Sequence, residues 1–132
     1  MNPLAVKALP RPGLEAHRES LSLKFSELVA RLVNLVGRKL TAYVGGVKDV
    51  RAVDRWIEGS EPYGDAEQRL RLMFQVVRTL SDHDSPKVVQ AWLIGVNPEL
   101  GDRVPARLLR EGDLTVVAPE VLRAARAFIA GG

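Results

Sequence analysis

The fold of this chain is decided by a stretch rich in helix-start and helix-end residues, residues 85–109, which read SPKVVQAWLIGVNPELGDRVPARLL. Ser85-Pro86 predicts the start of a helix, because a serine hydroxyl caps free backbone N–H groups and proline lacks an N–H where none is needed. Gly95 is expected to end that helix. Asn97-Pro98 then starts a second helix, and Pro105 starts a third. The pattern therefore predicts three short helices.

Helices this short are not stable alone in water, so the three must gain their stability from packing. We expect their apolar side chains to share one tight core, formed by Val89, Trp92, Leu93, Leu100, Leu108 and Leu109. This part of the chain is therefore predicted to be all-α.

The same segment resembles the toxin-binding domain of the Xre/MbcA/ParS family of bacterial antitoxins. In that family the pattern Trp-Leu-x-Gly-x-Asn-Pro-x-Leu-x-Gly-x-x-Pro-x-x-Leu-Leu recurs. This chain matches it directly over residues 92–100 and has the next glycine one place early, at Gly101. The match continues through Pro105 and the leucine pair 108–109. The alternative is a well-packed helical hairpin of some other fold.

The resemblance implies an antitoxin encoded beside a toxin, most often a RES-domain enzyme that degrades NAD. It implies neither catalysis nor a cofactor for the antitoxin itself. In the family, the last helix and the C-terminal tail approach the active site of the toxin and block substrate entry. The residues that would contact the toxin here are Trp92, Asn97, Pro98, Arg123, Arg126, Phe128, Ile129, Gly131 and Gly132. The alternative for Arg123 and Arg126 is that they are ordinary solvent-facing residues.

The composition is that of a folded soluble protein. Its 132 residues can form one domain, or two small helical domains that share a core. Hydrophobic residues make up 46% and charged residues 27%, which is typical of a globular chain. The chain has no cysteine, which excludes disulfides, cysteine-based zinc sites and thiol nucleophiles, so we expect a cytoplasmic protein.

Residues 1–18 carry three prolines and Gly13 among scattered charges, and we interpret them as a mobile arm. They lack the long apolar segment of a secretion signal. No uncharged apolar run in the chain approaches the ~18 residues of a membrane span, so a membrane is not an expected partner.

Apolar residues at steps of three and four predict a helix that begins near Leu23 and ends near Gly37. A shorter helix is expected over residues 38–44, followed by a flexible corner at Gly45-Gly46. A further helix is expected to end near Gly59. The residues expected on its buried side are Val50, Val53 and Ile57.

Residues 46–62 resemble the second half of an Xre-type helix-turn-helix, in which Gly-Val opens the turn and Arg-Trp-x-x-Gly closes the recognition helix. The start of a recognition helix enters the major groove of DNA. The residues that the resemblance implies in base or phosphate contact are Lys48, Asp49, Arg51, Ala52 and Arg55. Arg51 and Arg55 carry most weight, because an arginine can bind guanine through two hydrogen bonds or bind a phosphate.

A purely structural helix-turn-helix is the alternative, because Asp49 and Asp54 interrupt the basic face and the arginines could form exposed ion pairs. The net charge of +3 permits DNA binding without requiring it. Residues 1–62 hold 10 Lys or Arg and 7 Asp or Glu, whereas residues 63–132 hold 9 of each. Trp56 is expected to anchor its helix to the bundle, with stacking on a base as the less favoured alternative.

Residues 65–68 predict a capping box at the start of a long helix that runs to Leu80 and joins the two halves of the chain. Its apolar residues at helical spacing are Leu70, Met73, Phe74, Val77 and Leu80. Met73 and Phe74 are expected in the core of the chain. The alternative is a dimer seam, because antitoxins of the family commonly self-associate.

The cluster Asp82-His83-Asp84-Ser85 is the one segment whose residue types fit metal chemistry. It stands between two predicted helices and has no second histidine nearby, so we favour a solvated loop over a metal site. His17, the only other histidine, falls in the expected arm, which makes a nucleophilic triad improbable. Gly45-Gly46 lacks the lysine and hydroxyl residue of a phosphate-binding loop. We expect neither an enzyme nor a cofactor.

The C-terminal residues predict a last helix over about residues 120–130. The residues on its apolar side are Val121, Leu122, Ala125, Phe128 and Ile129. Pro119 leaves the start of this helix open. Residues 114–117 are partly β-branched and could be extended, although we expect packing to fold them onto the bundle.

Together these patterns predict an all-α protein with a mobile arm at 1–18, a helix-turn-helix region at 19–64, and a connecting helix with a toxin-binding domain at 65–132. The expected function is to bind and inhibit a RES-domain toxin, and to repress its own operon by binding DNA. The alternative is a DNA-binding transcription regulator without a toxin partner. The expected partners are the toxin, operator DNA and a second copy of the chain.

Overall fold

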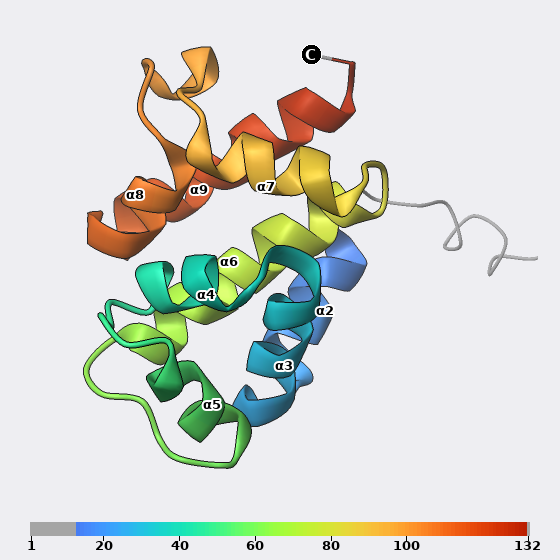
Figure 1. Cartoon of the computed structure of the whole chain (residues 1–132). Helices are drawn as coiled ribbons and strands as arrows, with labels where there is room; N and C mark the ends of the chain where they lie inside the picture. Colours follow the sequence, from blue (N-terminus) through green and yellow to red (C-terminus); the bar gives the residue numbers. More distant parts are fainter. Residues whose placement is uncertain (1–12, 132) are drawn as a thin grey trace, which may run out of the picture.

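The computed structural model describes residues 13–131, and this part of the chain is all-α, as predicted (Figure 1). It contains eight α-helices, one short 3₁₀ helix and no β-strand. The elements are α2 (Leu14–Ser22), α3 (Phe25–Val36), α4 (Arg38–Val44), α5 (Arg51–Ile57), α6 (Ala66–Ser81), α7 (Pro86–Ile94), η1 (Pro98–Leu100), α8 (Pro105–Glu111) and α9 (Leu114–Ile129). None of the helices in this described part combines the length and apolar character that a membrane span requires.

Helix α6 runs through the middle of the molecule (Figure 1), where it contacts α2, α3, α4, α7, α8 and α9. The five residues of its predicted apolar stripe are fully buried: Leu70, Met73, Phe74, Val77 and Leu80. The prediction that Met73 and Phe74 belong to the core is confirmed. Their alternative assignment to a dimer seam is wrong, because a seam needs side chains that remain exposed in the single chain.

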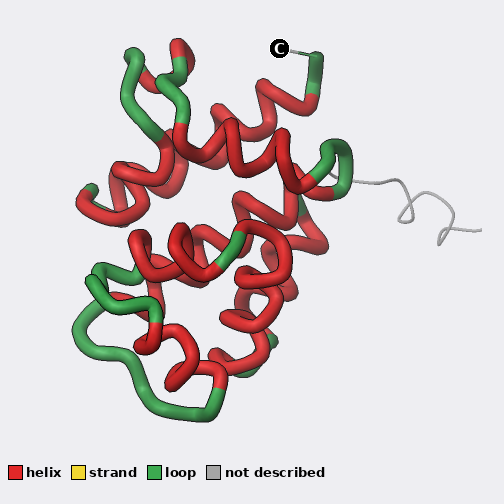
Figure 2. Tube along the Cα trace, viewed as in Figure 1, coloured by secondary structure: helices red, strands yellow, loops and turns green. Residues whose placement is uncertain are grey.

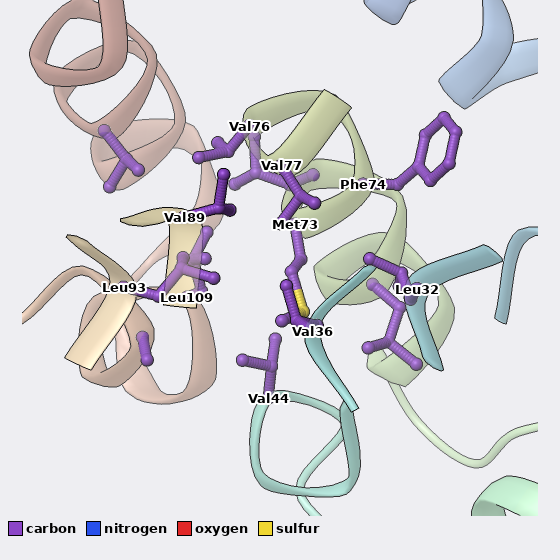
Figure 3. Packing of buried hydrophobic residues seen from close by; sticks show 14 of the residues in the cluster. Leu32, Val36, Val44, Met73, Phe74, Val76, Val77, Val89, Leu93 and Leu109 are labelled. Carbon is purple, nitrogen blue, oxygen red and sulfur yellow. The ribbon is translucent and has the colours of Figure 1, made fainter. Parts of the chain in front are cut away.

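The buried core is continuous from the N-terminal helices to the C-terminal helices. Figure 3 shows Met73 of α6 near Val36 and Val44, with Val89 and Leu93 of α7 packed on the same cluster. Fully burying a side chain of this size contributes about 1.5–3 kcal/mol. The two halves of the chain therefore share much of the apolar burial that stabilises them.

The three short helices predicted in residues 85–109 are present as α7, η1 and α8. Five of the six residues predicted to form their core are buried, and Leu108 is half-buried against the same cluster. The predicted helix over residues 38–44 is also present, as α4. Gly37 alone separates it from α3, at a φ of +92° that other residues rarely adopt.

Most connections between helices are short (Figure 2). The longest of those described is the loop of residues 58–65 between α5 and α6. Short connections keep many successive helices adjacent in space, as for α3 with α4, α4 with α5 and α8 with α9.

The arm predicted over residues 1–18 extends too far. Residues 14–18 belong to α2, whereas residues 1–12 lie outside the described part. Arg71 of α6 holds the end of α2, because its Nη1 donates to the carbonyl oxygens of Ser20 and Leu23, each at 2.9 Å. These residues are 51 and 48 positions from Arg71, so local composition carried no signal of the contact.

The capping box predicted at residues 65–68 is not formed, because the side chain of Asp65 accepts no backbone N–H at the start of α6. Its carboxylate instead pairs with Arg69 at 2.9 Å. Arg69 Nη1 also donates to the carbonyl oxygens of Leu109 and Gly112, both at 2.9 Å. The arginine thereby draws the aspartate away from the helix end and ties α6 to the end of α8.

Helix α9 begins at Leu114, not near Glu120 as predicted, and the extended alternative for residues 114–117 is wrong. Asp113 caps the helix, since its Oδ1 accepts a hydrogen bond from the backbone N of Thr115 at 3.0 Å. An aspartate at this position satisfies backbone N–H groups that have no partner inside the helix.

Pro119 lies inside α9, on its exposed side. A proline within a helix removes one backbone hydrogen bond and costs about 3 kcal/mol or more. Val117 and Val121 are buried on either side of it, and Ala124 and Ala125 continue the same buried face. Burial of this face offsets the cost. The helix therefore continues through Pro119 and does not begin after it.

Candidate protein-binding groove

Residues of α7, η1 and α9 line a groove of about 320 Å³. Helices α7 and α9 lie in the upper part of Figure 1. The lining residues of the groove are Ala91, Trp92, Gly95, Val96, Asn97, Pro98, Glu99, Ala124, Ala127 and Phe128. We call it the Trp92 groove. Four of the residues predicted to contact a toxin line it: Trp92, Asn97, Pro98 and Phe128.

Helix α7 places Trp92 in the floor of the groove. The helix starts where predicted, with Pro86 at its first position and Ser85 Oγ accepting a hydrogen bond from the backbone N of Val88 at 3.4 Å. The Trp92 side chain is almost buried, and its ring centre lies 6.5 Å from that of Phe128 with the planes tilted by 55°. This distance is within the range of a favourable aromatic pair.

The η1 segment forms a rigid lip built around Asn97. The Oδ1 atom of Asn97 accepts a hydrogen bond from the backbone N of Glu99 at 2.9 Å, and its backbone N donates to the carbonyl of Arg103 at 3.1 Å. Gly101 and Asp102 follow with φ values of +64° and +63°. The amide of Asn97 thus shapes the loop from inside, and Pro98 is the exposed residue of the pair.

An ion pair fixes this lip to α9. Arg103 Nη2 lies 2.5 Å from the carboxylate of Glu120, and Arg103 Nε donates to the carbonyl of Leu100 at 2.5 Å. Because α9 supplies the opposite wall through Ala124 and Ala127, the Arg103–Glu120 pair holds the two walls of the groove at a set distance.

The predicted toxin-contact residues of α9 do not all face the groove. Phe128 lines it, whereas Ile129 is half-buried and is not among the lining residues, so its contact with a toxin stays a prediction. Arg123 and Arg126 are exposed, and neither forms an ion pair with another residue of the described part. Gly131 is exposed, and Gly132 lies outside the described residues.

Sequence reasoning missed two exposed apolar side chains: Val96, which lines the groove, and Ile94, which lines a separate pocket with Tyr43 of α4. Ile94 is 63% exposed and Val96 is 69% exposed. The signal was present for Ile94, because the buried residues of α7 are Val89, Trp92 and Leu93, and Ile94 falls outside that helical face. Exposed apolar patches mark interaction surfaces, and Val96 extends the apolar lining of the groove.

The second candidate surface, at the start of α5, is partly neutralised. Arg51 Nε lies 2.9 Å from Oδ2 of Asp49, and the backbone N of Arg51 donates to Oδ1 of Asp49 at 2.9 Å. Hydrogen bonds from the Arg51 side chain, and then from its backbone N–H, hold the pKa of Asp49 below its ordinary value. The ion pair anticipated for the arginines is therefore present at Arg51.

Ala52 is only 8% exposed, so its side chain offers little surface for the predicted contact with DNA. Lys48 and Arg55 are exposed, and neither forms an ion pair within residues 13–131. Asp54 is paired with Arg38 of α4 at 2.5 Å, which reduces its effect on the basic face.

Trp56 anchors α5, as predicted, and stacking on a base is excluded by its burial. Its side chain is almost buried, and its ring centre lies 5.8 Å from that of Phe25 in an edge-to-face arrangement. Ile57 was expected on the buried face but is 37% exposed. The large indole of the preceding residue fills the space against α3, and the helix turns Ile57 outward.

Residues 82–85 form the loop between α6 and α7 that was favoured over a metal site. Asp82 pairs with Arg78, and Ser85 caps α7. Within residues 13–131 no group of three or more His, Cys, Asp or Glu side chains is arranged to hold a metal ion.

The Trp92 groove is the strongest candidate site because it brings together residues from two distant segments around an aromatic floor. A concave, mostly apolar lining with one carboxylate, Glu99, suits the binding of an apolar group. Comparisons with protein-family models, with curated proteins and with solved structures found no match to this chain.

Proposed function

We propose that this protein is an antitoxin that binds a RES-domain, NAD-degrading toxin and covers its active site. The proposal starts from the resemblance of residues 92–109 to the toxin-binding domain of Xre/MbcA/ParS antitoxins. The structural observation that supports it is that Trp92, Asn97, Pro98 and Phe128, all implied in toxin contact, line one groove. Phe128 stands far from the other three in the sequence, so the motif alone did not require this arrangement.

The character of the surface favours binding over catalysis. Val96 exposes an apolar side chain in the groove, as protein-binding surfaces do. Glu99 is the one ionisable residue among the lining residues, whereas acid–base catalysis needs positioned groups that exchange protons with a substrate. We therefore propose a binding protein without catalytic activity or a cofactor.

Inhibition in this proposal is steric. The groove and the exposed side of α9, with Arg123 and Arg126, would lie over the entrance of the toxin active site and keep NAD out. Because the substrate of such a toxin is a cytoplasmic metabolite, we place the complex in the cytoplasm.

We propose binding of operator DNA as a second function, and as the sole function if no toxin partner exists. The observation that favours it is the exposure of Lys48 and Arg55 at α5, where cationic side chains can reach phosphates. This surface is smaller than the sequence predicted, since Ala52 is buried and Arg51 is bound to Asp49.

Co-expression with the product of the neighbouring gene tests the antitoxin proposal. The neighbour carries the tag, and NAD consumption by the purified material is measured with and without this chain. We expect co-purification and suppressed NAD consumption. Recovery of an active NAD-consuming neighbour that does not bind this chain would contradict the proposal and leave DNA binding as the surviving function.

A matched pair of variants locates the contact surface. Val96→Asp places a charge in the groove, and Leu21→Asp places one on α2, where Leu21 is 67% exposed and so about as accessible as Val96 at 69%. We expect Val96→Asp to restore NAD consumption and Leu21→Asp to leave it suppressed. Equal behaviour of the two variants would count against the groove as the contact.

A further inference from the structure

The Trp92 groove has the size and shape to hold one side chain. We propose that it is a socket for a single large apolar side chain of the toxin, on a segment that also places a carboxylate beside Arg123. This inference rests on the proposed function and deepens it, since it names the chemistry of the partner at this surface.

The lining fits this occupant. The rings of Trp92 and Phe128 form the floor, while Ala91 and Gly95 on one wall and Ala127 on the other leave the space between them open. Small residues around an aromatic pair create a depression that an aliphatic or aromatic side chain fills with favourable contacts. Interfaces commonly concentrate their binding energy in such an anchor and pocket.

The socket is already formed in the free chain. The amide of Asn97 holds the lip through Glu99, and the Arg103–Glu120 ion pair joins that lip to α9. A pocket held in its binding shape loses little conformational freedom when it is occupied, so more of the interaction energy appears as affinity.

The charges on the two lips assign a direction to the bound segment. Arg123 is exposed on α9 next to Ala124 and one turn before Ala127, both of which line the groove. Glu99 stands on the η1 lip opposite. Neither side chain forms an ion pair with a described residue, so each remains free to pair across an interface. A segment with its carboxylate toward Arg123 on α9 and its cation toward Glu99 on η1 matches this arrangement. In the reverse orientation, like charges would face each other on both sides of the groove.

Filling the socket tests the proposal with the purified toxin complex. Ala91→Leu and Ala127→Leu each occupy the space from a different wall, and Gln68→Leu on the exposed side of α6 is the control for an added surface leucine. We expect each filled variant to bind the toxin at least about tenfold more weakly and Gln68→Leu to bind within about twofold of wild type, in line with anchor residues at interfaces. Thermal unfolding identifies any variant that has lost its fold.

Two outcomes separate the inference from the function on which it rests. If wild type binds the toxin and both filled variants bind equally well, the socket is wrong and the antitoxin function stands. If wild type does not bind the toxin at all, both are wrong.

Charge reversal tests the orientation. Arg123→Glu and Arg126→Glu make the same chemical change on the same helix, but Arg126 lies farther around α9 from the groove. We expect Arg123→Glu to weaken toxin binding at least about tenfold and Arg126→Glu to have a smaller effect, because charge pairs at close range dominate. Equal effects of the two variants would overturn the assigned carboxylate.

A titration with toluene, an analogue of an aromatic side chain, tests the socket without the toxin. We expect saturable NMR shifts of the Trp92 indole N–H that disappear in Ala127→Leu. Absence of shifts overturns the socket. The other possible occupant of the groove is a second copy of this chain, and sedimentation of the chain alone tests for it. A dimer that dissociates in Ala127→Leu would assign the groove to that second copy and overturn the proposal.

Discussion

Arg110 lies over the ring of Tyr43, with its guanidinium carbon 4.7 Å from the ring centre, and its Nη1 donates to the carbonyl oxygen of the same residue at 2.7 Å. The two residues are 67 positions apart. Tyr43 is near the end of α4, just before the Gly45-Gly46 corner that leads to α5. This contact therefore connects α8 to the end of α4, which leads to the candidate DNA surface at α5.

Replacing Arg110 by alanine is expected to lower the free energy of unfolding by about 1–2 kcal/mol, the sum of a modest cation–π contact and one charged hydrogen bond. Denaturant unfolding measures the change. Arg107→Ala is the control, since Arg107 is an exposed residue of the same helix that pairs only with Glu111 four positions later. A loss no larger than that of the control would mean that the Tyr43 contact contributes no stability.

The close approach of Gly45 to Trp56 predicts that even one methyl group is not tolerated there. A Cβ on Gly45 would lie 2.6 Å from the indole Cη2. The φ of Gly45 is −69°, so backbone strain plays no part, and we expect Gly45→Ala to cost about 1–3 kcal/mol through overpacking. Combining it with Trp56→Phe, which makes room, should cost less than the sum of the single changes; simple additivity in this double-mutant cycle would contradict the steric explanation.

The cap of α9 predicts a pH dependence of stability. Hydrogen bonds from the Thr115 hydroxyl, and then from its backbone N–H, hold the pKa of Asp113 below its ordinary value. A carboxylate with a lowered pKa in the folded state stabilises the fold above the unfolded-state pKa of about 4, and this contribution disappears as the pH falls through the folded-state value.

Asp113→Asn is therefore expected to lower stability at neutral pH and to approach wild type as the pH falls through the folded-state pKa, where the wild-type carboxyl also becomes neutral. Denaturation midpoints across this pH range measure the difference. Asp102→Asn is the control for replacing an aspartate by asparagine away from the cap. Asp102 has a φ of +63°, which asparagine tolerates, so the change adds no backbone strain. A stability difference for Asp113→Asn that does not change with pH would show that the negative charge of the cap is unimportant.

The pairing of Asp49 with Arg51 predicts opposite effects of two substitutions on DNA binding. Asp49→Asn removes a negative charge and frees Arg51, so affinity for DNA of the chain's own promoter should rise. Arg55→Ala removes an exposed cation and should weaken binding and reduce its salt dependence. Fluorescence anisotropy at several salt concentrations measures both, and unchanged affinity in both variants would mean that α5 does not contact DNA.

Helix boundaries set by neighbouring residues could be predicted from the sequence. Helix α4 matches its predicted residues because Gly37 and Gly45 bound it, and α7 matches because Ser85-Pro86 and Gly95 do. Caps and glycine conformations involve only a few adjacent residues, so their signals are local.

Boundaries set by distant residues could not be predicted. The end of α2 is held by Arg71 of α6, and α9 extends back through Pro119 because burial of Val121 and its neighbours offsets the lost hydrogen bond. In both cases the local signal, a proline-rich start or a helix-breaking residue, was outweighed by packing. The same reason explains why Asp65 pairs with Arg69 and does not cap α6.

By itself, the sequence determined the all-α class, the order of most helices and the candidate residues Trp92, Asn97 and Pro98, because periodicity, caps and a resemblance to known antitoxins are properties of contiguous residues. Only the tertiary structure decided which candidates act together. It placed Phe128 and the small residues of α9 in one groove with Trp92, left Ala52 only 8% exposed, and exposed Ile94 and Val96. A groove has two walls from separate segments, and the burial of a side chain depends on every helix around it, so neither can be derived from one stretch of chain.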